Sequence, residues 1–507
     1  AAYALGMIGI GFYYSRRIKT GEDFLLGGRK INSFAAGISL FATMLSTITY
    51  LSLPGEVIKH GPVFVVGQLI GFPIVFLITS YFIIPFFMRI RITSAYEILE
   101  KPLGRGVRLT ASIIFISLRF LWMGLLIFLT SKVMVVIMNW NAGYIPVLSV
   151  AIGVITLIYS SMGGLRAVVI TDVAQFTLLL LGAVLTMVFI TSNVGGITEW
   201  FPNTWSPNWD NLVIFSFDPF IRITLFTAIL YPILWWLCTS GSDQMAIQRF
   251  ISTRNTGAAR RAFGMTMIAE IVVTLILTFV GFALLKYYLI NPHFIPDGKN
   301  LISDSDFLFP HYIVNFLPVG ITGLVVAGLL SAAMSSLSSG LNSTATVITT
   351  DFALYVKKLK QEKNNTVTFA RVISIVVGIL AVSLSLLMDK IPGNIIEVTA
   401  KTSNLFVAPL FNLFFMAMFV PFATPMGTIT GAIYGVASAF LLAFWDVFTG
   451  RPGWSFMWIL PVPLTISIFF SVLFSLLPTK GKKISVQCAW SVGLLIPLAV
   501  ACVLLLT

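Results

Sequence analysis

The sequence predicts an all-α protein that crosses a membrane many times. Three observations support this fold class: 57% of the 507 residues are hydrophobic, only 10% are charged, and the mean hydropathy is +0.95. Soluble domains carry about 25% charged residues, and a soluble chain needs polar residues to cover its surface. Apolar runs of about 20 residues, the length of a membrane-spanning helix, recur along the whole chain.

The apolar runs predict about 14 transmembrane helices in one transporter domain. The predicted helices begin near residues 1, 32, 61, 106, 143, 164, 218, 258, 316, 368, 394, 426, 455 and 486. The chain begins without methionine inside an apolar run, so we expect further residues to precede Ala1.

The positions of Lys and Arg predict the orientation. Basic loops such as SRRIKTGEDFLLGGRK (15–30) and QRFISTRNTGAARR (248–261) alternate with loops that have few or no basic residues, such as 191–217. Because Lys and Arg collect in cytoplasmic loops, this alternation places the first residue outside. We therefore expect an integral protein of the bacterial inner (plasma) membrane, in contact with the lipid bilayer.

Composition also disfavours other classes of protein. The net charge of +13 is spread over many loops, whereas nucleic-acid binding needs a basic face, so no nucleic-acid partner is expected. The three histidines and three cysteines show no catalytic or metal-ligand spacing, so we predict that the chain is not an enzyme. The sequence leaves the oligomeric state open.

One predicted span has an unusual number of hydroxyl groups. The stretch SAAMSSLSSGLNSTATVITTDF (331–352) places Ala332, Ser335, Ser339 and Asn342 at helical spacing on one face. Small residues and serines also let membrane helices pack closely, which is the structural alternative. Four serines in five positions favour an ion site, because oxygen ligands suit hard cations.

A second polar span could form the other wall of that site. In SLFATMLSTITYLSLPGEV, Thr43, Ser46 and Thr49 are followed by Pro54 and Gly55. Irregular backbone at membrane depth is tolerated only where it lines a cavity, and broken helices hold ions and substrates in many transporters. A kinked packing helix is an equally good interpretation of this segment alone.

Ionisable residues inside predicted spans are candidates for function. Asp172 follows Arg166 by six residues, and a direct ion pair between them is the less favoured reading. Glu270 and Lys401 have opposite charges and could pair across a cavity. Arg119 could extend its charge to the interface or pair within the bundle. Asp243 lies near the inner end of its span, beside Arg249 in the stretch SDQMAIQRF. Its position favours a structural or gating ion pair.

Four motifs resemble the sodium:solute symporter family, which includes carriers of sugars, sialic acid, iodide, vitamins and monocarboxylates. The motifs are FATMLSTITY, YSSMGGLRAVVITDVAQF, SDQMAIQRF and SAAMSSLSSGLNSTATVITTDF. The resemblance implies a LeuT-like fold of inverted five-helix repeats at about 32–195 and 218–422, with flanking helices at 1–15 and 426–507. It also implies sodium-driven symport by alternating access.

The resemblance implies two sodium sites. The positions that match the family's general site are Ala42, Leu45, Ala332, Ser335 and Ser336. A second site of some members falls on Asp172, Ser338 and Ser339, with Ser335 as a shared ligand.

The resemblance further implies a solute site in a central cavity. The matching positions are Ser46, Thr49, Gln68, Glu270, Lys401, Arg119 and Trp122. The chain departs from sugar carriers, which have lysine where Glu270 stands and glutamine near Lys401. It also departs from sialic-acid carriers, which have arginine where Trp122 stands, although Arg119 lies one turn earlier.

The implied function is therefore sodium-coupled import of a small polar organic solute: a sugar, sialic acid or a related sugar acid. The alternatives are a carrier of a monocarboxylate, vitamin or other organic anion, and a proton-coupled or sensing relative. An ion channel is disfavoured because a broken helix facing a serine-rich helix is typical of a carrier.

Overall fold

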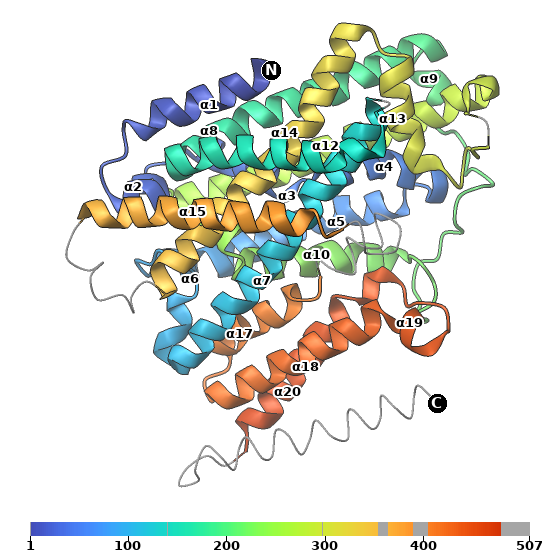
Figure 1. Cartoon of the computed structure of the whole chain (residues 1–507). Coiled ribbons are helices and arrows are strands. Elements are labelled where there is room, and N and C mark those ends of the chain that lie inside the picture. Colours follow the sequence, from blue (N-terminus) through green and yellow to red (C-terminus); the bar gives the residue numbers. More distant parts are fainter. Residues whose placement is uncertain (1, 139, 297, 353–362, 389–403, 478–507) are drawn as a thin grey trace.

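The computed structural model describes residues 2–138, 140–296, 298–352, 363–388 and 404–477. These residues form helices joined by loops and turns, with no strand among them. The helices pack side by side into one bundle (Figure 1). The principal helices before the middle of the chain are α1 (Ala2–Ser15), α2 (Gly21–Leu26), α3 (Ser33–Met44), α4 (Thr47–His60), α5 (Val63–Ile78), α6 (Ile84–Met88), α7 (Glu97–Ile137), α8 (Ile145–Val194) and α9 (Ile197–Trp200).

The second part of the chain continues the bundle. Its principal helices are α10 (Leu225–Ser242), α11 (Gln244–Ile251), α12 (Thr256–Ile290), α13 (Ser305–Asn315), α14 (Val319–Val347), α15 (Lys363–Ser385), α17 (Val407–Phe419), α18 (Pro425–Ala443), α19 (Trp445–Thr449) and α20 (Pro461–Ser475). Short one-turn elements include η2 (Thr79–Ile83), which joins α5 to α6, and η5 (Ile348–Phe352), which extends α14.

Nine helices of the described residues are long and apolar enough to cross a membrane, or ten if the bent pair α3 and α4 is one span. The expected number of about 14 is therefore not confirmed. The helix expected at the start of the chain, α1, has only 14 residues. The helix expected near residue 394 begins outside the described residues, and α17 within it has 13 residues. The helix expected near residue 486 lies wholly outside them.

Two expected spans lie within one element, α8. It has 50 residues, so a straight helix would be about 75 Å long, more than twice the thickness of the hydrocarbon core. Gly164 interrupts it with φ 56° and ψ −162°, a conformation that is essentially restricted to glycine. The prediction of separate helices near residues 143 and 164 is consistent with this interruption.

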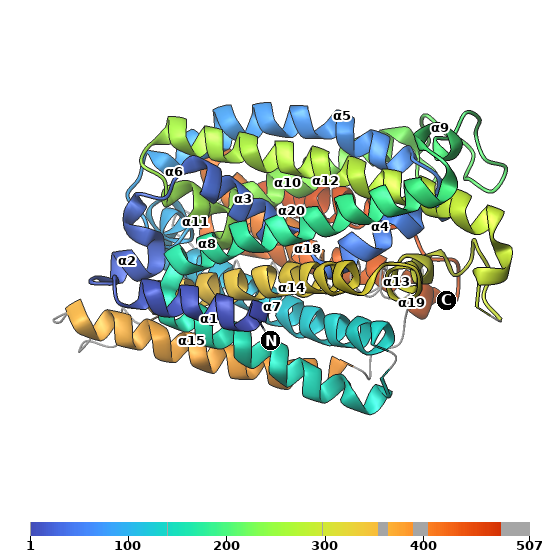
Figure 2. The ribbon, with the colours of Figure 1, turned by 90° about the horizontal axis from the view of Figure 1, so that it is seen from above.

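Helix α14 runs through the middle of the bundle. It packs against α8 and α3 on one side and against α7 and α15 on the other, as the view in Figure 2 shows. Every residue from Ser331 to Val347 is buried. The hydroxyl groups of this helix therefore face protein rather than lipid.

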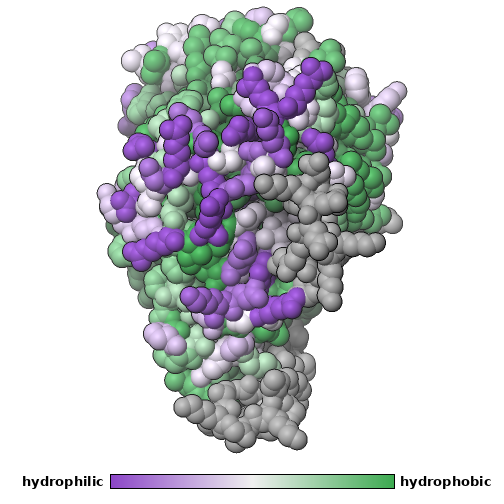
Figure 3. Space-filling model, turned by 90° about the vertical axis from the view of Figure 1, so that its left-hand side faces the viewer, coloured by the Kyte–Doolittle hydropathy of each residue, from purple (hydrophilic) through white to green (hydrophobic). Residues whose placement is uncertain are grey.

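The two ends of the bundle differ in charge. Hydrophilic side chains gather at the end that holds α2 (Figure 3). The exposed basic residues of the neighbouring loops include Arg16, Arg17, Lys19, Lys30, Arg91 and Arg254. Arg29 donates a hydrogen bond of 2.7 Å to Glu22 here, which lowers the pKa of that carboxyl below its ordinary value. The opposite end carries α9, α13 and α19 (Figure 1).

We expect Gly164→Ala to lower the thermal unfolding midpoint of the detergent-purified protein. A Cβ atom at this position would lie 2.5 Å from the carbonyl oxygen of Phe24, and the backbone conformation costs other residues about 1–3 kcal/mol. Gly106→Ala is the matched control, because its Cβ would meet nothing within 4 Å. Equal midpoints for the two variants would show that the interruption of α8 does not require glycine.

Candidate functional site

The chain breaks between α3 and α4 at the centre of the bundle. The two helices meet at 69°, and Leu45 between them is extended, with φ −74° and ψ 122°. Ser46 begins α4 as its N-cap and accepts a hydrogen bond of 3.2 Å from the Thr49 amide. The last carbonyls of α3 have no partner in their own helix. The predicted break is therefore present, and it leaves backbone oxygens free to bind another group.

Helix α14 supplies side chains to this break. The Ser336 hydroxyl lies 2.9 Å from the carbonyl oxygen of Thr43 and 3.1 Å from that of Leu45. In the opposite direction, the Thr47 hydroxyl donates to the carbonyl of Leu329 at 2.9 Å. Oxygen atoms of α14 and of the break, which are 291 to 293 residues apart in the sequence, therefore lie side by side.

A small cavity lies beside the break. Four of the five positions expected for the general sodium site, Ala42, Leu45, Ala332 and Ser335, line it together. The other lining residues are Phe41, Gln175, Phe176, Leu179 and Ser331. Ser336, the fifth expected position, contacts the break itself. The structure therefore brings all five positions to one place.

Asp172 of α8 is fully buried next to this cavity. It accepts hydrogen bonds from Ser335 at 2.7 Å and from Ser39 at 2.5 Å. Its nearest cation is Arg249, whose guanidinium nitrogen lies 3.6 Å from the carboxylate. Arg166 instead donates to the carbonyl of Gly27 at 2.8 Å. A buried carboxylate needs such a counter-charge, and α11 supplies it.

The two remaining serines of the expected second site differ in their contacts. The Ser339 hydroxyl lies 2.7 Å from that of Thr43 and accepts a hydrogen bond from Arg249. The Ser338 hydroxyl donates to the carbonyl of Ser335 within its own helix at 3.0 Å. The guanidinium of Arg249 therefore lies between Asp172 and Ser339, a position that sequence reasoning did not assign to it.

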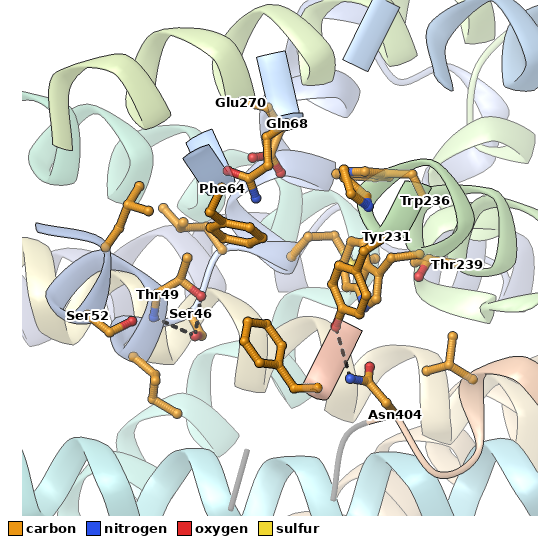
Figure 4. Close-up of a pocket in the computed structure, with 18 of the residues that line it drawn as sticks. Ser46, Thr49, Ser52, Phe64, Gln68, Tyr231, Trp236, Thr239, Glu270 and Asn404 are labelled. Carbon is orange, nitrogen blue, oxygen red and sulfur yellow. Dashed lines mark hydrogen bonds between the residues drawn. The ribbon is translucent and has the colours of Figure 1, made fainter. Parts of the chain in front are cut away.

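A larger cavity of about 310 Å³ opens on the other side of the break. Six of the expected solute positions line it: Ser46, Thr49, Gln68, Arg119, Trp122 and Glu270. The seventh, Lys401, lies outside the described residues. Gln68 and Glu270 point into the cavity from α5 and α12, while Ser46 and Thr49 reach it from the break (Figure 4).

The cavity combines aromatic walls with a few polar groups. Phe64, Phe72, Trp235 and Trp236 contribute rings. The Gln68 amide oxygen is buried without a hydrogen-bond partner among the described residues. None of the ion pairs between described residues includes Glu270. Hydrogen-bond acceptors on one wall and rings on others suit a solute with hydroxyl groups and apolar faces.

The ion pair expected for Asp243 is present, but its neighbour Arg249 is not the partner. Asp243 pairs with Arg119 of α7, because it occupies a break between α10 and α11 that faces this helix. Its own backbone is extended there, with φ −83° and ψ 123°. Arg119 lines the solute cavity, but its charge is neutralised by Asp243.

Sequence reasoning missed two pairs of residues at the cavity. The Asn404 amide donates to the Tyr231 hydroxyl at 2.9 Å (Figure 4). Arg222 forms two hydrogen bonds of 2.8 and 2.7 Å with Glu56. Arg222 and Asn404 each lie a few residues before a helix begins, where sequence patterns are least informative.

The larger cavity adjoins a second cavity toward the end of the bundle that holds α13. Glu56, Arg222 and Phe456 also line this second cavity of about 340 Å³, which extends to α13 and α19. On the side of α2, Gln248 donates to the carbonyl of Leu25 at 2.6 Å and to Asn342 at 2.9 Å. Arg249 next to it is fully buried. Gln248 and Arg249 therefore pack closely between α2 and α14 at the basic end.

Comparisons with known proteins agree with this geometry. A family model described as "Sodium:solute symporter family" matches residues 24–435. The chain is 32% identical over 450 residues to the "Sodium/sialic acid symporter SiaT" of Proteus mirabilis (strain HI4320), with 86% of each chain covered. It is 27% identical over 503 residues to the human "Sodium-coupled monocarboxylate transporter 2", which covers 97% of this chain and 79% of that one.

A solved structure shares the fold. It is described as the "Substrate-bound outward-open state of a Na+-coupled sialic acid symporter", and it superposes with a TM-score of 0.80 and 27% identity over 95% of this chain and 98% of that one.

We expect Arg249→Met to lower the free energy of unfolding by about 3–5 kcal/mol, because it leaves the Asp172 carboxylate buried without a cation. Adding Asp172→Asn to that variant removes the stranded charge and should restore part of the loss. Thermal unfolding of the single and double variants measures the coupling. Lys299→Met is the control, since its pair with Asp304 is partly exposed and worth about 1 kcal/mol or less. Additive losses in the double variant would contradict a direct pair.

Proposed function

Because the chain belongs to the sodium:solute symporter family, we propose that its cargo is sialic acid or a related sugar acid, carried inward together with sodium by alternating access. The observation that carries the proposal is the contact of Ser336 with the carbonyls of Thr43 and Leu45. It joins the serine-rich helix to the broken helix, beside a cavity of sufficient size for a sugar.

The first sodium ion binds at the break. Its ligands are the backbone oxygens of Ala42, Leu45 and Ala332 and the hydroxyls of Ser335 and Ser336. Carbonyl and hydroxyl oxygens are the ligands that hard cations prefer. In support, four of these residues line one cavity, and the Ser336 hydroxyl already binds two carbonyls of the break.

A second sodium ion binds between Asp172, Ser338 and Ser339, with Ser335 shared. Support comes from the Asp172 carboxylate, which Ser335 contacts at 2.7 Å. The Arg249 guanidinium lies 3.6 Å from the same carboxylate and repels a second cation. We therefore expect the second ion to bind more weakly than the first. Two ions would couple transport to the membrane potential at about 2.3 kcal/mol per charge per 100 mV.

The solute binds in the larger cavity. Ser46 and Thr49 at the break, Gln68 and Glu270 on the opposite wall, and Trp122 line it. The acceptor oxygens of Gln68 and Glu270 fit hydroxyl groups of a sugar, and the rings fit its apolar faces. The similarity to sialic-acid symporters names the first solute to test. A simple monocarboxylate is less well supported, because it offers few hydroxyl groups to the acceptor oxygens of Gln68 and Glu270.

The basic end of the bundle faces the cytoplasm of a bacterial cell, and the end with α13 faces outward. The support is the excess of exposed Lys and Arg around α2 (Figure 3), as expected for cytoplasmic loops. With this orientation the start of α1 lies toward the outside, and the second cavity lies toward the outer end. Closing the outer end and opening the network of Gln248 would release the cargo inside.

Two inverted five-helix repeats, at about 32–195 and 218–422, build the transport unit. In support, each contains a broken helix: α3 and α4 meet at Leu45 and Ser46, and α10 and α11 meet at Asp243. Leu45 and Asp243 adopt nearly the same extended backbone, with ψ 122° and 123°. Broken helices at corresponding positions of two repeats are typical of such carriers.

A thermal-shift screen tests the solute class. Sialic acid, other sugar acids, neutral sugars and monocarboxylates are added to the purified protein in sodium chloride or choline chloride. A ligand of the folded state raises the unfolding midpoint, and we expect the largest sodium-dependent shift with sialic acid or another sugar acid. A shift with monocarboxylates alone would contradict the proposed cargo.

We expect Ser336→Ala to raise the sodium concentration for half-maximal uptake about tenfold, which corresponds to about 1.4 kcal/mol. Uptake of radiolabelled sialic acid into proteoliposomes at varied sodium measures this change. Ser343→Ala is the matched control on the same helix, because its hydroxyl binds only the carbonyls of Ser339 and Gly340 in its own helix. An unaltered sodium dependence in Ser336→Ala would remove this residue from the site.

We expect Glu270→Gln to raise the KM for the solute by about 10- to 100-fold, because an amide NH2 group replaces one acceptor oxygen and leaves a solute hydroxyl unpaired, which costs about 1–3 kcal/mol. Sodium binding measured without solute should remain near that of the parent protein. Glu199→Gln, at an exposed position in α9, controls for the loss of one negative charge. If Glu270→Gln changed the sodium affinity and left KM unaltered, Glu270 would belong to an ion site instead.

A further inference from the structure

Gln175 of α8 has an amide oxygen that no hydrogen bond satisfies. The residue is 1% exposed, and its Oε1 atom is buried without a partner among the described residues. Its Nε2 atom lies 2.8 Å from the Tyr3 hydroxyl and 3.5 Å from the Tyr159 hydroxyl. Buried acceptors without a donor are uncommon and costly, so this oxygen calls for a physical explanation.

The neighbouring tyrosine fixes which end of the amide faces it. The Tyr159 hydroxyl donates its hydrogen to the carbonyl of Met334 at 3.0 Å, so its oxygen is left as an acceptor. An acceptor needs a donor opposite; the Nε2 group of Gln175 is such a donor at 3.5 Å, and the Ser338 side chain also contacts this hydroxyl. Rotating the amide by half a turn would place two acceptors face to face. The oxygen of Gln175 therefore points away from Tyr159.

Gln175 lines the small cavity beside the break, together with Ala42, Leu45, Ala332 and Ser335. It also follows Asp172 by three residues, which places both side chains on one face of α8. The other lining residues are largely apolar: Phe41, Phe176 and Leu179. The cavity thus offers one unsatisfied amide oxygen next to the positions of the first proposed sodium site.

We infer that the amide oxygen of Gln175 is a further ligand of the sodium ion at this first site. The inference rests on the sodium site proposed above. Oxygen ligands with partial negative charge suit a hard cation. A cation can bind several acceptor oxygens at once, whereas a water molecule can donate only two hydrogen bonds. Gln175 would make α8 part of the first site, next to the Asp172 carboxylate of the second.

The test measures sodium binding without any solute. The purified protein is heated in sodium chloride or in choline chloride of equal ionic strength, and the unfolding midpoint is followed as sodium increases. We expect Gln175→Leu and Gln175→Ala to raise the sodium concentration for the half-maximal shift at least about tenfold. Gln175→Glu keeps an oxygen at this place, so its half-maximal sodium concentration should not exceed that of the parent protein by more than about threefold.

The variants separate a ligand from a packing residue. A residue that only holds Tyr3 and Tyr159 through its nitrogen would lose that role in Gln175→Glu as well as in Gln175→Leu. Equal sodium sensitivity of Gln175→Glu and Gln175→Leu would therefore overturn the inference. Thr186→Val is the matched control, because this buried hydroxyl of α8 binds only the carbonyl of Gly182 in its own helix; its sodium dependence should be unaltered.

The outcomes also separate this inference from the proposed function. A parent protein that sodium stabilises no more than choline would contradict the sodium site itself. If sodium stabilises the parent protein, and Gln175→Leu and Gln175→Ala reach half-saturation at the same sodium concentration, only the role of Gln175 is overturned. If Gln175→Leu does not fold, Gln175→Ala and Gln175→Glu still provide the comparison.

Discussion

The contact between the Ser336 hydroxyl and the carbonyls of Thr43 and Leu45 determines the organisation of this protein. A helix broken in the middle of a bundle leaves backbone oxygens without partners, and such groups are tolerated at membrane depth only when something binds them. Helix α14 provides the hydroxyl, and the carbonyl of Leu329 accepts from Thr47 in return. A second helix therefore binds the carbonyl groups at the break, which a continuous helix would bind with its own amides.

Buried ion pairs link the segments around this contact. Asp172 and Arg249, Asp243 and Arg119, and Asp351 and Arg108 each join distant parts of the chain. Removing one member of a buried pair is strongly destabilising, whereas the intact pair adds little net stability. Their effect is therefore to favour one arrangement of the helices. The rearrangement of the bundle during transport must preserve these pairs or exchange their partners.

The sequence was sufficient to predict the membrane class, the break and the serine face. The membrane class and the serine face depend on local pattern, namely apolar length and serines at helical spacing. The position of the break came from the family resemblance, because Pro54 and Gly55 lie inside α4. The partner of Asp243 was not predictable, because Arg119 lies 124 residues away and Arg249 is nearer in sequence. Charge alone does not determine which of the two arginines pairs with Asp243. The pairing depends on the direction in which the break between α10 and α11 faces. The orphan oxygen of Gln175 likewise depends on the hydrogen of Tyr159, which no local pattern encodes.

The position of the break explains how sodium and solute could influence each other. Leu45 lines both the small cavity and the larger one, and Ser46 and Thr49 follow it directly. An ion that fixes the carbonyl of Leu45 also restricts the backbone that carries these two hydroxyls. Solute then binds to a wall that is already ordered, so it loses less conformational entropy. Since coupling free energy is reciprocal, solute must tighten sodium binding by the same factor. One extended residue between two helices would be sufficient to transmit this effect, because Leu45 borders the cavity of the proposed ion and the cavity of the proposed solute.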